Sequence, residues 1–131
     1  MQLTGSARRL GIVGSALLAA GGVAQAHHSV TAAYDTSKVI TIDGEVEELE
    51  LGSPHSHLTI GVTGAGGKSV SWQTELASVA FLKRAGWTER SLSVGEHVRL
   101  TGSPSKNNPT QLYVISVTKA DGSQLALIPN R

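Results

Sequence analysis

The sequence predicts a mainly β protein, a small OB-like barrel of five or six strands with one helix between strands three and four. Three observations predict this class. Apolar residues alternate in several short segments, one segment after the third strand has helical spacing instead, and the long first strand carries a glycine at its centre. The alternative is an α+β sheet with one covering helix.

The first three strands are expected in residues 38–51, 57–62 and 68–74. Gly44 lies inside the first of them, and a strand interior gains little else from glycine than a bulge or a bend. A bent first strand can serve both halves of a barrel. The glycine-rich stretch at residues 63–67 lies between two strands and predicts a hairpin.

Helical spacing follows the third strand. Leu76, Val79 and Leu82 recur on one face, two basic residues fall in the last turn, and Gly86 provides a C-terminal stop. Cations at this end complement the helix dipole. We expect Trp87 to fold back on the helix.

The second half of the barrel is expected from residues 96–102, 111–119 and 123–128. The segment 103–110 contains two prolines and two asparagines and reads as a loop. An Asp-Gly pair at 121–122 predicts the last hairpin.

The N-terminus has the pattern of an export signal. Arg8 and Arg9 precede a weakly apolar run at residues 10–23, and small residues in the order Ala-Gln-Ala come just before His27. This run is shorter than the roughly 20 residues of a membrane-spanning helix, and an anchoring or buried helix would also have to accommodate several glycines. We therefore expect residues 1–26 to be a signal peptide, and a periplasmic or secreted protein with no membrane span after cleavage. The general and the twin-arginine export routes both remain open.

Cleavage there would leave 105 of the 131 residues, enough for one domain. We expect residues 27–37 to form an extended N-terminal arm and residues 38–131 a single OB-like barrel. Without Arg8 and Arg9, nine Lys and Arg face ten Asp and Glu, so general attraction to nucleic acid is not expected. Cysteine is absent, which excludes disulfides and thiolate sites.

Several segments together resemble a family of small exported bacterial proteins of unknown function. The segments are Ala26-His27-His28-Ser29, Tyr34-Asp35, the strand from Val39 to Val46, Pro54-His55, the stretch from Leu82 to Thr88 with its Arg-x-Gly-Trp-Thr motif, Val94-Gly95-Glu96 and Leu100-Thr101-Gly102. Ser53 stands where that family usually has Asn. The resemblance implies export and this fold, and it implies no particular chemistry.

Four histidines in two clusters form the candidate metal site: His27, His28, His55 and His57. An N-terminal His27 would offer its α-amine and its Nδ1 in one chelate ring. One further imidazole would complete a three-nitrogen set, which suits copper. His55 is the first choice for this third ligand, with His28 or His57 as competitors, and the arm would reach it by packing along the first strand. Alternatively, the terminal pair is exposed and free of metal, His55 caps a turn, and His57 is a surface residue.

Glu75 follows the third strand and is a candidate to orient a metal-binding histidine by accepting a hydrogen bond from its other ring nitrogen. A carboxylate near a helix N-terminus explains it equally well. His97 and the four glutamates between residues 45 and 50 read as surface positions.

No nucleophile motif, phosphate loop or zinc-hydrolase signature is present, so we expect no enzyme. The predicted function is an exported small β-barrel binding protein, with copper as its candidate cofactor. One alternative is a metal-free periplasmic module that binds a partner protein or small ligand. Another is a small copper-dependent redox protein.

Overall fold

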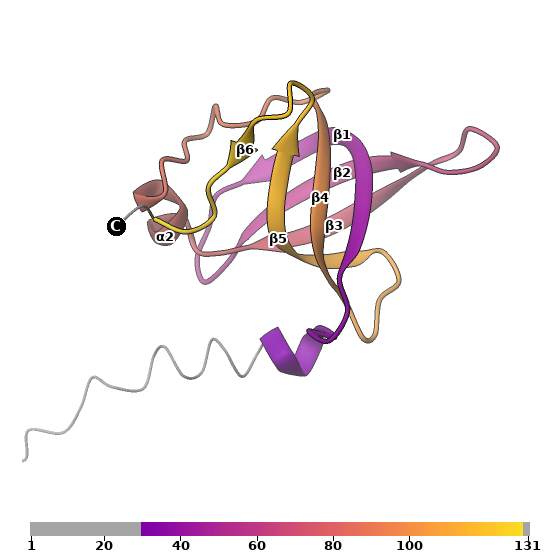
Figure 1. Ribbon diagram of the computed structural model, residues 1–131, viewed down its shortest axis with the longest axis horizontal. Coiled ribbons are helices and arrows are strands. Elements are labelled where there is room, and N and C mark those ends of the chain that lie inside the picture. Colours follow the sequence, from indigo (N-terminus) through magenta and orange to yellow (C-terminus); the bar gives the residue numbers. More distant parts are fainter. Residues whose placement is uncertain (1–29, 130–131) are drawn as a thin grey trace, which may run out of the picture.

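The computed structural model describes residues 30–129, which form six strands, the helix α2 and one helical turn at residues 30–33 (Figure 1). The bounds are β1 Ile40–Glu50, β2 Ser56–Thr63, β3 Ser69–Leu76, α2 Val79–Arg84, β4 His97–Pro104, β5 Gln111–Lys119 and β6 Gln124–Leu125. The predicted signal peptide, residues 1–26, lies outside the described residues, as do His27 and His28.

Strands β1 to β5 close into a barrel. The sheet order is β3-β2-β1-β4-β5-β6, and a parallel pairing of β3 with β5 joins the two ends of the five-stranded set. With α2 between β3 and β4, this is the OB-like barrel that the sequence predicts. An open α+β sheet is not what forms, because Gln73, Thr74 and Glu75 pair directly with β5.

Strand β1 is shared between the two halves of the barrel. Its residues 40–45 pair with β4 and its residues 45–50 pair with β2. The register irregularity lies between Val46 and Glu48, so the bulge is not at Gly44. Gly44 has a different reason: a Cβ there would sit 2.5 Å from the Gly61 carbonyl oxygen, so only glycine allows this approach of β1 to β2.

Helix α2 ends as its sequence predicts. Gly86 has φ +98°, its N–H donates to the Lys83 carbonyl, and the N–H of Trp87 donates to the Leu82 carbonyl. This pair of bonds is a Schellman cap. The cap turns Trp87 back into the core, where its indole N–H donates to the Ala126 carbonyl at 2.7 Å.

That indole bond also explains why the last strand is short. The segment expected at residues 123–128 pairs with β5 only over Gln124–Leu125. Beyond it, Ala126 faces Trp87 instead of β5, so the chain leaves the sheet toward α2 (Figure 1).

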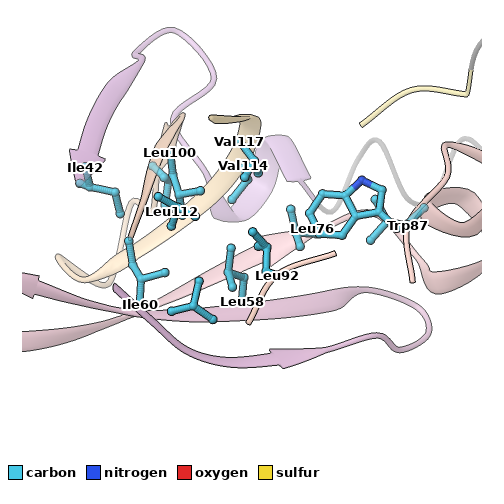
Figure 2. Packing of buried hydrophobic residues seen from close by; sticks show 13 residues of the cluster. Ile42, Leu58, Ile60, Leu76, Trp87, Leu92, Leu100, Leu112, Val114 and Val117 are labelled. Carbon is cyan, nitrogen blue, oxygen red and sulfur yellow. The ribbon is translucent and has the colours of Figure 1, made fainter. Parts of the chain in front are cut away.

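The core is one cluster of apolar side chains from every strand of the barrel and from α2 and the connection after it (Figure 2). Leu58, Ile60, Leu100 and Leu112 are fully buried inside the barrel, while Trp87 lies beside Leu76 at one end. The strand faces that point away from this core are therefore the surfaces on which a polar site can form.

The described part of the N-terminal arm is not extended. Residues 30–33 are helical, and the N–H of Tyr34 donates to the Val30 carbonyl at 2.8 Å. The arm docks on the β4–β5 loop and not along β1: Asp35 N–H donates to the Pro104 carbonyl, and Lys106 N–H to the Ala33 carbonyl (Figure 1). Burial of the Tyr34 ring gives the arm an anchor that an extended, solvated segment would lack.

Within residues 30–129, none of the helices combines the length and apolar character that crossing a membrane requires.

Candidate functional site

Glu75 is the centre of a polar cluster on the outer side of the barrel wall. Its neighbours Thr74 and Leu76 are each 1% exposed, so strand alternation directs Glu75 away from the core. The Glu75 side chain is nevertheless only 18% exposed, because other residues cover it. A carboxylate in such a position needs hydrogen-bond donors.

His55 is the first partner of this carboxylate. Its Nδ1 lies 2.6 Å from Glu75 Oε1, and its side chain is 25% exposed. The loop that carries His55 is fixed at both ends, since the Gly52 carbonyl accepts from the Val79 N–H and Ser56 N–H donates to the Ala77 carbonyl. His55 is thus held between the ends of β1 and β3, and the carboxylate sets the direction of its ring.

Tyr34 is the second partner and comes from the arm. Its hydroxyl donates to Glu75 Oε2 at 2.7 Å, and its ring is 6% exposed. Tyr113 is in register with Glu75 across the β3–β5 pairing. The centroid of its ring lies 5.6 Å from the centroid of the Tyr34 ring. Burial, and secondarily the bond to Glu75, raises the pKa of Tyr34 far above its ordinary value of 10.0. Burial and then the charge on Glu75 also raise the pKa of Tyr113.

The structure therefore brings together two of the site residues predicted from the sequence, His55 and Glu75. It adds Tyr34 and Tyr113, which the sequence analysis did not assign to a site. The signals for Tyr34 were the Tyr34-Asp35 segment of the family resemblance and the lack of any other Phe, Trp or Tyr in residues 27–37. His57 pairs in register with both Glu50 and Glu75, but its side chain is exposed and makes no hydrogen bond or ion pair to a described residue.

This cluster offers one possible metal ligand, the Nε2 atom of His55. When the carboxylate accepts from Nδ1, that nitrogen carries the proton and Nε2 keeps its lone pair. The described residues contain no group of three or more His, Asp or Glu that could hold a metal ion by itself. The other predicted ligands, His27 and His28, lie outside the described residues.

The free energy of unfolding should depend on pH above 10 because the Tyr34 phenol is buried. Because its pKa in the folded protein is above 10.0, the folded protein keeps a proton that the unfolded chain releases. The stabilisation by Tyr34 is then complete below pH 10 and is lost as the pH rises further. Urea unfolding should show Tyr34→Phe less stable by about 1–3 kcal/mol at pH 8, the cost of a hydrogen bond to a charged group. The difference should shrink between pH 10 and 11, and a constant difference would contradict this assignment.

Fold and site together define a small OB-like β-barrel with an arm-covered His–Glu–Tyr cluster on its wall. The chain belongs to a family of unknown function, DUF6152, whose profile matches residues 16–122. No curated protein matches the chain.

Proposed function

We propose that this is an exported copper-binding protein, in which the amine and Nδ1 of an N-terminal His27 and the Nε2 of His55 bind one Cu(II) ion. The observation that carries the proposal is the 2.6 Å contact of His55 Nδ1 with Glu75. Histidines that bind metals commonly donate their other ring nitrogen to a carboxylate in this way.

The donor set suits copper chemically. A planar set of three nitrogen ligands binds Cu(II) more tightly than the other divalent metals of the first transition row. Cysteine is absent from the chain, and its one methionine is Met1, so no sulfur ligand competes in the mature protein. The expected resident ion is therefore Cu(II), held by imidazole and amine.

Chain length allows the two parts of the site to meet. Tyr34 is anchored on the carboxylate that holds His55, and one helical turn separates Tyr34 from Val30. His27 is three residues before Val30, so its Cα lies within about 11 Å of Val30 for a fully extended chain. This reach supports the proposal that the chain end meets His55.

Export and the chelate can be tested together. The protein secreted by its native host should begin at His27, which intact mass and N-terminal sequencing of the mature chain would show. Chain produced with this native terminus should then bind Cu(II) tightly, and one extra residue ahead of His27 should weaken binding by more than the ~10–100-fold that an outer-shell partner is worth. Equal affinity of both forms contradicts the chain-end chelate.

A metal-free binding module is the second candidate, and one groove favours it. The groove has a volume of about 490 Å³ and lies where the β2–β3 hairpin leaves β1, with Glu45, Glu47, Thr63 and Ser69 in its walls. This volume falls within the usual range for small-molecule sites, and the hydroxyls and carboxylates would suit a polar ligand. Absence of tight Cu(II) binding in both terminal forms would support this second candidate.

A further inference from the structure

Glu75 holds two partners on two different oxygens. The Tyr34 hydroxyl donates to Oε2 at 2.7 Å, and His55 Nδ1 lies against Oε1 at 2.6 Å. A carboxylate is planar and rigid, so a donor that fixes one oxygen also fixes the direction of the other. The backbone on either side of Glu75 is held by the buried Thr74 and Leu76. The remaining freedom of the side chain is what Tyr34 removes.

The position of the Tyr34 hydroxyl depends in turn on the docked arm. Backbone bonds of 2.9 Å from Asp35 to Pro104 and 3.0 Å from Lys106 to Ala33 fasten the arm on either side of Tyr34. The Tyr34 ring is packed on Tyr113 with 50° between the ring planes. Docking of the arm and orientation of His55 therefore share one carboxylate.

We infer that Tyr34 is a positioning residue for His55: the docked arm, acting through Glu75, selects the imidazole tautomer that carries its proton on Nδ1 and leaves Nε2 open to a ligand. The coupling is reciprocal, so His55 also holds the arm on the barrel. This inference deepens the proposed function, on which the identity of the Nε2 ligand rests. The coupling itself belongs to the metal-free protein.

The tautomer can be measured directly in metal-free protein. Imidazole ¹⁵N shifts at pH 8.5, after removal of metal with EDTA, distinguish a protonated ring nitrogen from an unprotonated one. For the wild type we expect two widely separated His55 signals, with Nδ1 protonated. In Tyr34→Phe, which keeps the ring and removes the hydroxyl, the two signals should move toward a common averaged value.

Tyr113→Phe is the matched control. It removes a hydroxyl from the same cluster, and that hydroxyl has no hydrogen bond among the described residues, so the His55 signals should keep the wild-type separation. His57 and His97 serve as internal references for an intact fold in the same spectra. Unchanged His55 signals in a folded Tyr34→Phe protein would overturn the inference.

The effect of His55 on the docked arm provides a second test, which does not require the Tyr34→Phe variant to fold. In His55→Gln, amide hydrogen exchange at Asp35 and Lys106 should become about 5-fold faster or more, the low end of usual coupling between sites. Exchange at the wild-type rate would also overturn the inference. Failure of Cu(II) binding would leave both results standing, so the two proposals can fail separately.

Discussion

Replacing Gly102 with alanine is expected to destabilise the barrel strongly, because among the described glycines an added Cβ would meet its closest neighbour at this position. Gly102 is buried in β4, and a Cβ there would overlap the carbonyl oxygen of Tyr113 and sit 2.8 Å from Leu112 Cγ. Both neighbours belong to β5, so relief requires β4 and β5 to move apart. Overpacking typically costs about 1–3 kcal/mol, and overlap with a main-chain carbonyl belongs at the upper end, about 3 kcal/mol. For a domain of this size that loss lowers Tm by roughly 12 °C or more.

The control is Gly64→Ala in the β2–β3 hairpin, where the nearest atom to an added Cβ is 3.8 Å away. That substitution should leave Tm unchanged or raise it slightly, since alanine reduces the freedom of the unfolded chain. Thermal unfolding followed by circular dichroism compares the two. Equal Tm values for the two variants would show that β4 and β5 are not as close as the structure has them.

The second large effect is expected on Cu(II) affinity. His55→Ala in a protein with the native His27 terminus should weaken binding by more than ~100-fold, because it removes a ligand and not merely an outer partner. Glu75→Gln should cost about 10–100-fold, since the amide is a poorer acceptor for the Nδ1 proton.

His57→Ala is the matched control for this loss. His57 stands two residues from His55, but its side chain is exposed and makes no hydrogen bond or ion pair among residues 30–129. The His57→Ala variant should therefore bind Cu(II) with wild-type affinity, which competition titrations with a chelator of known affinity would measure. If His57→Ala weakens binding as much as His55→Ala, the assignment of His55 as the third ligand is wrong.

The sequence predicts the order of the strands and the helix along the chain because their signals are local. Alternation of apolar residues marks each strand, and Gly86 after two basic residues marks the end of α2. The exact course of β1 is not local in this sense. Its bulge falls between Val46 and Glu48, where no residue type announces it, and Gly44 is required by its distance from Gly61 on another strand.

In the candidate site, too, some features have local signals in the sequence and others arise only from the tertiary fold. Two histidines with i, i+2 spacing can be picked out by inspection, but nothing in that spacing says that His55 finds a carboxylate while His57 faces solvent. Tyr34 and Glu75 are 41 residues apart and meet because the barrel closes and the arm folds over it. The helical turn at residues 30–33 and its bonds to the β4–β5 loop are likewise tertiary effects that override a weak local pattern.

The central claim is that the chain end and His55 share one Cu(II) ion. Electron paramagnetic resonance of the native-terminus protein with one equivalent of Cu(II) tests it most directly, because hyperfine coupling identifies the nitrogens bound to copper. We predict coupling to three nitrogens in the wild type and to one imidazole fewer in His55→Ala. Identical spectra for the wild type and His55→Ala would contradict the claim.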